Sequence, residues 1–294
     1  MMNLTSKIKV EILPWTCTRC SFLVTQHYDY CTLCDTRSSI IHIVNKGIPY
    51  KKLDKNKRVE KTFGQKTNII LPVLDYDNEV DFKNNITKLY PYFQQKKIHG
   101  IWILSSSSSI ETIQNIFKWS KKNYPDFWIG INLVGENIFE NIHFLIDYNP
   151  DGIWVDQSYI TDNEIQNIPN ILIDQFTRLN WNGLYFGGIL FKYQPQIGNS
   201  EKICKNALPY MDVLCTSGDA TGVPIKLEKL NMIERLANKK IKIAVASGIT
   251  AENVKNIKNK TDIFILKTSI VDINNNNNIN LDKLDLFINS LNKQ

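Results

Sequence analysis

Four cysteines near the start of the chain form two pairs of the type Cys-x-x-Cys. Cys17 and Cys20 make the first pair, and Cys31 and Cys34 follow after ten intervening residues. Four thiolates at this spacing can surround one Zn²⁺ as tetrahedral ligands. A segment this small has too little core to fold by itself, so metal binding would supply most of its folding free energy. The pattern predicts a structural zinc site within a small module over residues 1–44.

The residues around these cysteines resemble the Ran-binding-protein type zinc finger. The resemblance covers residues 13–38 and rests on the cysteine spacing together with Trp15, Phe22 and Arg37. It implies that the Trp15 ring packs on the finger. The chain departs from the family at Val24, where the family usually has asparagine.

Fingers of this family have two kinds of partner. The ubiquitin-binding kind resembles Thr-Phe after the second cysteine and an apolar residue between the last two, and Ser21, Phe22 and Leu33 stand at those positions here. The RNA-binding kind has an asparagine followed by an aromatic that stacks on a base, whereas Val24 and Thr25 stand here. The resemblance favours ubiquitin over RNA, and a finger that merely packs on the rest of the chain is the third interpretation.

A second set of chemically capable residues follows short apolar segments further along the chain. Asp156 and Lys192 are the candidate catalytic groups. A carboxyl group can carry a proton, and a lysine amine can form a Schiff base, act as a general acid or pair with a substrate carboxylate. The alternative for Asp156 is a structural ion pair. For Asp75 a solvated loop is favoured, because Asp77 and Glu79 follow it.

The last third of the chain carries a phosphate-binding pattern. Ser247-Gly248 breaks an apolar segment just before a helical one, and Thr250 suits the helix N-cap. A glycine lets a phosphate approach the backbone amides, and a helix N-terminus favours an anion. The alternative is that Gly248 only eases a tight turn. The predicted ligand-binding residues are Asn132, Ser217, Gly218, Ser247, Gly248, Lys267 and Thr268.

Eight short apolar segments are available to position these groups. They are residues 68–74, 100–104, 127–134, 152–155, 183–191, 212–216, 241–246 and 262–268. Segments with helical periodicity lie between most of them, and residues 168–176 are assigned to such a helix. Alternating strands and helices predict an α/β fold, a (β/α)8 TIM barrel over residues 67–294. A doubly wound sheet is the second choice, but no glycine-rich fingerprint follows the first strand.

The barrel segments resemble the BtpA family of predicted barrel enzymes. The resemblance covers about residues 68–272 and is most specific over residues 212–253, which include Ser217-Gly218-x-x-Thr221-Gly222. It implies a phosphate-binding TIM barrel, and family members are linked to photosystem I biogenesis or to sugar and nucleoside metabolism. The chain departs from the family in the serine run 105–109, which replaces a carboxylate, and at Lys267, which replaces a glycine.

Two hypotheses about function follow. In the first, the barrel is an enzyme acting on a phosphorylated sugar or a nucleoside-type molecule. In the second, the chain is a zinc-finger adaptor that binds ubiquitin or another protein, with a catalytically degenerate barrel. The intact glycine motifs favour the enzyme, and the serine run favours the adaptor.

Composition sets the remaining expectations. The 294 residues carry 35 basic and 29 acidic side chains, and this mild surplus does not by itself argue for nucleic acid. Residues 45–66 hold eight basic residues against two acids and few large apolar groups, which favours a solvated basic linker. The sequence has no apolar run long enough to span a membrane and no secretory signal. Clustered cysteines then indicate an intracellular, reducing compartment, cytoplasmic or nuclear.

Overall fold

The computed structural model describes residues 55–64, 67–76, 78–105, 109–133, 148–164, 166–179, 181–194, 198–272 and 278–293, and four two-residue strands nearer the N-terminus. The chain divides into two compact units, residues 1–51 and 52–294. In the first unit, β1 (Lys9–Val10) pairs with β4 (Ile43–Val44), and β2 (Trp15–Thr16) pairs with β3 (Leu23–Val24), both antiparallel. The predicted zinc ligands and partner-binding residues lie outside the described residues; they are Cys17, Cys20, Cys31, Cys34, Ser21, Phe22 and Leu33.

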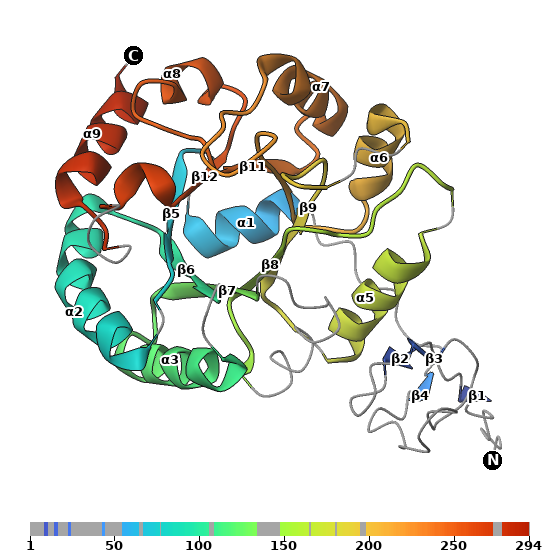
Figure 1. Cartoon of the computed structure of the whole chain (residues 1–294). Helices are drawn as coiled ribbons and strands as arrows, with labels where there is room; N and C mark the ends of the chain where they lie inside the picture. The colour runs from blue at the N-terminus through green and yellow to red at the C-terminus, as the bar shows by residue number, and fades with distance from the viewer. Residues whose placement is uncertain are drawn as a thin grey trace. The chain divides into compact units, whose positions relative to one another are not determined.

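Eight parallel strands of the second unit close into a barrel in chain order (Figure 1). The strands are β5 (Ile69–Leu74), β6 (Gly100–Ser105), β7 (Trp128–Leu133), β8 (Gly152–Val155), β9 (Leu184–Gly188), β10 (Val213–Thr216), β11 (Lys242–Ala246) and β12 (Ile263–Leu266). The last strand closes on the first, with Ile263 opposite Ile69. The predicted (β/α)8 barrel is therefore confirmed, and each of the eight apolar segments forms a strand.

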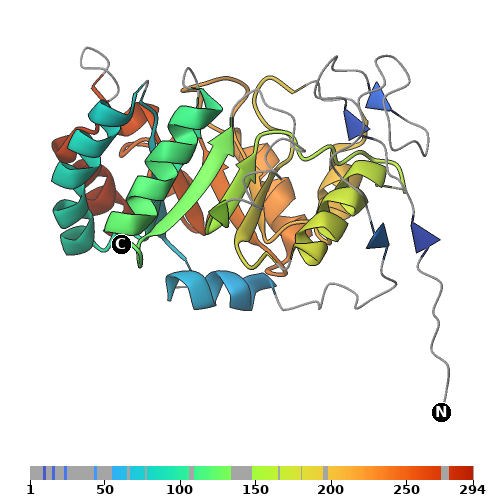
Figure 2. The ribbon, with the colours of Figure 1, turned by 90° about the horizontal axis from the view of Figure 1, so that it is seen from below.

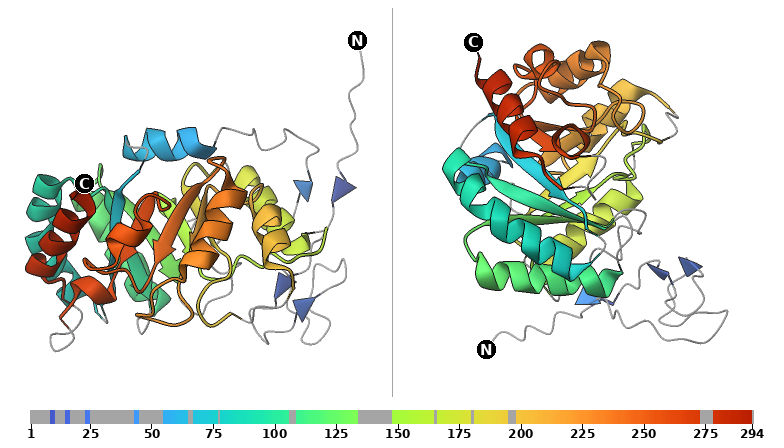
Figure 3. Two further views of the ribbon diagram at one scale, coloured as in Figure 1. Left: turned by 90° about the horizontal axis from the view of Figure 1, so that it is seen from above. Right: turned by 60° about the vertical axis from the view of Figure 1, so that its left-hand side comes forward.

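Helices surround this barrel on its outer side (Figure 1; Figure 3, right). They are α2 (Glu79–Lys96), α3 (Ile110–Asn123), α5 (Asn167–Arg178), α6 (Ser200–Ala207), α7 (Leu227–Ala237), α8 (Val254–Ile257) and α9 (Leu281–Asn292), with a 3₁₀ turn η1 (Thr268–Ile270) after β12. The assignment of residues 168–176 to a helix is confirmed by α5. The closing helix α9 buries Leu284, Phe287 and Leu291, which recur at helical spacing. None of the described helices is long and apolar enough to cross a membrane.

Indole rings fill the barrel interior, and glycines on neighbouring strands make room for them. The Trp102 ring lies edge-on to Trp128, with centroids 4.9 Å apart, and both belong to a cluster of buried side chains inside the barrel. A Cβ atom added at Gly130 would overlap the Trp102 ring, and one added at Gly152 would overlap the Trp128 ring. Gly130 and Gly152 therefore provide the space that the indole rings of the adjacent strands occupy.

A further helix, α1 (Lys55–Phe63), closes the N-terminal end of the barrel. It crosses the middle of the ring in Figure 1 and lies beneath the strands in Figure 2. Val59 is fully buried, and Phe63 packs with its ring 5.2 Å from that of Trp128. The composition of residues 45–66 favours a solvated linker, but the structure gives an ordered helix there. Val59 and Phe63 lie four residues apart, so both point to the same face of the helix.

Polar contacts hold α1 to the barrel. The Arg58 guanidinium lies 3.3 Å from the Asp212 carboxylate, and both side chains are largely buried. Lys55 Nζ donates to the carbonyl of Leu208 at 2.6 Å, and Asn56 donates to the carbonyl of Lys239 at 2.7 Å. The helix is therefore part of the barrel unit.

Candidate functional site at the C-terminal rim of the barrel

The polar residues singled out from the sequence follow the C-terminal ends of the strands. Asp75 follows β5, Asp156 follows β8, Ser217 follows β10, Ser247 follows β11 and Lys267 follows β12. In a parallel barrel these ends meet at one rim, which is where the active sites of this fold lie. The sequence prediction therefore concerns a single region of the molecule.

Asp156 is held at this rim by a residue of β7 and by a residue of the loop that follows β9. Asn132 on β7 is buried, and its amide donates a hydrogen bond to Asp156 Oδ1 at 3.2 Å. The side-chain amide of Gln194 donates to the Asp156 carbonyl, and Gln194 Oε1 accepts from the N–H of Phe191 at 3.2 Å. Asp156 is therefore tied to the loop after β9.

Burial raises the pKa of the Asp156 carboxyl above its usual range. The hydrogen bond from Asn132 and the positive charge of Lys192 act in the opposite direction without cancelling the effect of burial. A carboxyl group with a raised pKa holds its proton at higher pH than a solvated one, which suits a group that takes and returns protons.

Lys192 follows the next strand, β9, and is fixed by both its backbone and its side chain. Its N–H donates to Ser217 Oγ at 2.8 Å, and its Nζ donates to Thr221 Oγ1 at 3.2 Å. The preceding residue, Phe191, is buried against Trp154 with ring centroids 6.0 Å apart. The two predicted catalytic residues therefore lie at the same rim of the barrel, and the predicted binding residue Ser217 contacts Lys192.

One residue of the rim has no signal in the sequence. Lys229, in the first turn of α7, donates its ammonium to the carbonyl of Ser217 at 2.8 Å and to the carbonyl of Leu190. Burial lowers the pKa of this lysine. Lys229 thereby joins the ends of β9 and β10 beneath Lys192, a role that only the three-dimensional arrangement reveals.

A second pair of opposite charges joins the first and last strands of the barrel. Lys267 donates to Asp75 Oδ2, and the Asp75 side chain is 2% exposed while that of Lys267 is 30% exposed. The acidic neighbours of Asp75 in the sequence favour a solvated loop, but the structure buries the carboxylate in this ion pair. Thr268, the next predicted ligand-binding residue, is exposed at the start of η1.

The two predicted phosphate-binding glycines have a packing partner within the chain. Gly248 has a φ of +66°, and a Cβ atom added there would overlap the Val223 carbonyl. A Cβ atom at Gly218 would overlap the same carbonyl. The backbone of residues 223–224 therefore packs against both glycines. It occupies the space next to them where the sequence analysis places a phosphate.

Thr250 and Asn253 form reciprocal hydrogen bonds like those of a capping box, but α8 begins at Val254 and its N-cap is Asn253 rather than the predicted Thr250. Thr250 Oγ1 accepts from the N–H of Asn253 at 3.3 Å, and Asn253 Oδ1 accepts from the N–H of Thr250 at 2.9 Å. The Asn253 amide also donates to the Gly248 carbonyl at 2.7 Å. This turn fixes the loop after β11, so Ser247 and Gly248 have a defined position.

Nine non-glycine residues in the described part of the chain have positive φ angles, and four of them lie in the loops that follow the strands. Tyr159, Leu190, Tyr193 and Ser247 have positive φ angles of 56°, 47°, 60° and 68°, and all four lie in loops at the C-terminal rim. Residues with a side chain adopt this conformation at a cost, and they do so most often where function requires it.

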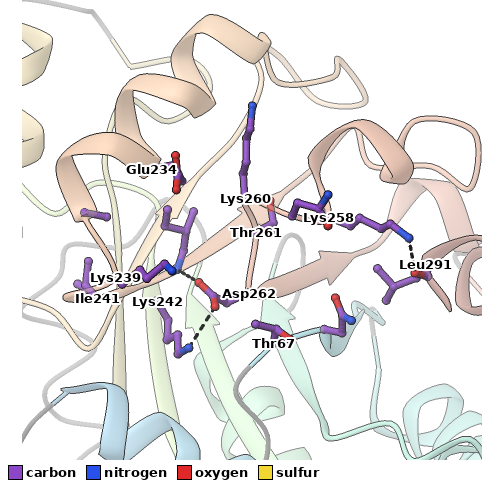
Figure 4. A pocket seen from close by; sticks show the side chains of 14 residues that line it. Thr67, Glu234, Lys239, Ile241, Lys242, Lys258, Lys260, Thr261, Asp262 and Leu291 are labelled. Atoms are coloured by element: carbon purple, nitrogen blue, oxygen red, sulfur yellow. Dashed lines mark hydrogen bonds and ion pairs between the residues drawn. The ribbon is translucent and has the colours of Figure 1, made fainter. Parts of the chain in front are cut away.

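A hollow of about 440 Å³ lies at the opposite end of the barrel (Figure 4). Lysines line it, but Lys242 is paired with Asp262 at 3.2 Å, and Lys258 donates to the carbonyl of Leu291 at 3.3 Å. Helices α7, α8 and α9 end there, and lysines at helix C-termini compensate the negative end of the helix dipole. These contacts give the basic residues a structural role.

Comparison with known proteins connects the rim to a family. Residues 186–293 match the model of the BtpA family. The matched segment runs from within β9 to the end of the chain's last helix, and it contains Lys192, Ser217, Ser247 and Lys267. No curated protein matches the chain.

Solved structures share the barrel at low sequence identity. The 3-keto-L-gulonate-6-phosphate decarboxylase from Vibrio cholerae is 12% identical with a TM-score of 0.56, over 76% of this chain and 97% of that one. A structure described as "Native KDPGal structure" is 12% identical with a TM-score of 0.55, over 77% and 95%. The phosphoribosyl anthranilate isomerase from Thermus thermophilus is 9% identical with a TM-score of 0.52, over 76% and 98%. These likenesses establish the fold.

Proposed function

We propose that the barrel is an enzyme that acts on a small phosphorylated molecule, of the sugar or nucleoside type, at its C-terminal rim. The observation that carries the proposal is that Asp156 and Lys192 follow consecutive strands at one rim of the barrel. Asn132 and Gln194 hold Asp156 there, and Ser217 holds Lys192. A carboxyl with a raised pKa beside an ammonium is an arrangement for moving a proton and stabilising the negative charge that results.

The substrate class is supported by the comparisons. Two of the similar structures carry the phosphate group of a small molecule in their names, as 6-phosphate and as phosphoribosyl. The BtpA match covers the part of the barrel that contains the loops after β11 and β12. These two loops are where barrels of this kind usually bind a phosphate group.

Each residue then has a proposed role. Asp156 takes a proton from the substrate or returns it, and Lys192 stabilises the adjacent negative charge. The phosphate is bound by the Lys192 ammonium together with Ser247, Lys267 and Thr268. Gly218 and Gly248 hold the loop that carries Thr221, because both accommodate the Val223 carbonyl.

Thermal unfolding of the full chain tests this proposal. The probes are inorganic phosphate, sulfate, ribose 5-phosphate and a nucleoside monophosphate. A ligand at a hundred times its dissociation constant adds about 2.7 kcal/mol to the free energy of unfolding. For a unit of this size the midpoint is expected to rise by about 5 to 11 °C.

Two substitutions give this measurement its meaning. Lys192→Met is expected to remove the shift, whereas Lys205→Met, at an exposed position on α6, is expected to keep it. A folded chain whose midpoint moves with none of the probes would contradict the proposed function. A shift that survives Lys192→Met would place the phosphate elsewhere.

For the N-terminal segment we propose one structural Zn²⁺ bound by Cys17, Cys20, Cys31 and Cys34, supported by the spacing of the two cysteine pairs. Metal analysis is expected to give one zinc ion per chain, and the double variant Cys31→Ser/Cys34→Ser none. A ubiquitin contact through Ser21, Phe22 and Leu33 is the proposed partner interaction. It predicts ubiquitin binding that chelation abolishes, and a chain that binds zinc but not ubiquitin would refute it.

A further inference from the structure

Tyr193 combines three features that a surface tyrosine does not need. Its side chain is 72% exposed, its φ is +60°, and it directly follows the candidate catalytic residue Lys192. The left-handed conformation is unfavourable for a bulky residue. The conformation therefore has to be maintained by specific contacts.

Those contacts converge on Thr221, in the loop after β10. The N–H of Thr221 donates to the Tyr193 phenol oxygen at 3.1 Å. The hydroxyl of the same threonine accepts from Lys192 Nζ at 3.2 Å. Two consecutive residues of the β9 loop therefore hold the backbone and the side chain of one threonine. The N–H of Tyr193 also donates to the Asp219 carbonyl at 3.4 Å.

The loop that carries Thr221 is also held from its other side. The N–H of Gly222 donates to Ser247 Oγ at 2.9 Å, and the Val223 carbonyl packs on Gly218 and Gly248. The loop is thus fixed between the β9 and β11 loops. The Tyr193 phenol oxygen supplies the link on the side of Lys192.

We infer that Tyr193 is a positioning residue for Lys192: its phenol oxygen fixes Thr221, and the Thr221 hydroxyl in turn holds the Lys192 ammonium at the rim that also carries Asp156. The inference rests on the proposed function, because Lys192 and Asp156 are the catalytic groups of that proposal. The bond from Thr221 also lowers the pKa of the Tyr193 phenol, as expected for an oxygen that accepts a hydrogen bond.

The substitution Tyr193→Phe removes only the phenol oxygen, and Tyr210→Phe is the matched control at the other end of the barrel. Sulfate is the probe, because its charge does not change between pH 5 and pH 8. By calorimetry, Tyr193→Phe is expected to weaken sulfate binding about 3- to 10-fold, the effect of losing one hydrogen bond. Tyr210→Phe is expected to leave the affinity unchanged.

The pH dependence of sulfate binding distinguishes positioning from a general loss of structure. Two titratable groups interact electrostatically with Asp156: the ammonium of Lys192, which lies in the β9 loop, and the thiol of Cys215, which lies on β10. The thiol is fully buried with a raised pKa, so it stays neutral throughout this pH range. The Lys192 charge lowers the pKa of Asp156, so a less firmly held ammonium is expected to move the midpoint of the pH profile upward.

Tyr193→Gly is the second variant, because glycine adopts a positive φ without strain. The inference predicts weaker sulfate binding with a urea-unfolding midpoint equal to or above that of the wild type. Unchanged affinity and an unchanged pH midpoint in Tyr193→Phe would overturn the inference. Lys192→Met distinguishes a failure of the proposed function from a failure of the role of Tyr193. If Lys192→Met and Tyr193→Phe both leave sulfate binding intact, the proposed function fails. If Lys192→Met abolishes binding and Tyr193→Phe does not weaken it, only the role of Tyr193 fails.

Discussion

Replacing Arg58 by methionine removes a cation that is paired with Asp212 at the N-terminal end of the barrel. The two groups lie 3.3 Å apart, with side chains that are 13% and 4% exposed. Asp212 Oδ2 also accepts from the N–H of Tyr185 at 2.9 Å. Removing one partner of a buried pair leaves an uncompensated charge and typically costs about 3–5 kcal/mol. At about 2–4 °C per kcal/mol for a unit of this size, the thermal midpoint is expected to fall by roughly 6–20 °C.

The pH dependence of that loss follows from the direction of the pKa shift. Burial raises the pKa of Asp212 in the folded chain, and the Arg58 charge partly offsets this effect. Without Arg58 the folded-state pKa rises further above the unfolded value. The stability of the variant is then fully present below the unfolded-state pKa and is lost as the pH rises through the folded-state pKa. The deficit relative to the wild type is therefore largest near pH 8 and shrinks towards pH 4.5.

Urea unfolding at several pH values measures this deficit, with two further variants as controls. Arg235→Met removes an exposed pair with Glu201 and is expected to cost less than about 1 kcal/mol. Adding Asp212→Asn to Arg58→Met keeps an acceptor for the N–H of Tyr185 and removes the charge, so it is expected to recover part of the loss. An Arg58→Met deficit below about 1 kcal/mol, or one equal at both pH values, would refute the reasoning.

Three further predictions concern the rim and the core. Asp156→Asn is expected to be more stable than the wild type at pH 7.5, and the difference is expected to vanish towards pH 4. The raised pKa of Asp156 means that the wild type loses stability as this carboxyl ionises. Urea titrations that give the same difference at both pH values would contradict this prediction. Gly130→Ala is expected to cost about 1–3 kcal/mol by overlap with Trp102, and Trp102→Phe in the same chain should recover part of it in thermal unfolding. Lys229→Met leaves two carbonyls without their donor and is expected to cost about 1–3 kcal/mol and weaken sulfate binding, unlike Lys226→Met at an exposed ion pair; equal effects of the two would rule out a special role for Lys229.

The strands were predictable because each is a short apolar segment buried on both faces. That burial makes β8 (Gly152–Val155) readable as a continuous apolar run. Helix α1 was not predictable in the same way, because its basic residues dominate the composition and the helix buries only two side chains, those of Val59 and Phe63. The sequence indicates a functional rim, since Asp156 and Lys192 follow strand ends.

Contacts between distant segments account for what the sequence left open at the rim. Asp75 is paired with Lys267, which is far away in the sequence, so the acidic neighbours of Asp75 in the chain are a poor guide to its environment. A side chain at position 248 would overlap the Val223 carbonyl, which belongs to another loop. The bond between Tyr193 and Thr221 likewise joins two loops whose proximity is set by the barrel.

Helix α1 has a consequence for how this chain can be divided. A fragment that begins at the first barrel strand would lack the helix whose apolar face covers one end of the barrel, and Trp128 would lose the ring that packs on it. It would also leave Asp212 as a lone charge at the opened end. The barrel is therefore not a cassette that starts at residue 67. A boundary between residues 51 and 55 keeps helix α1 attached to the barrel. A fragment made to study the cysteine-rich segment separately should therefore end there.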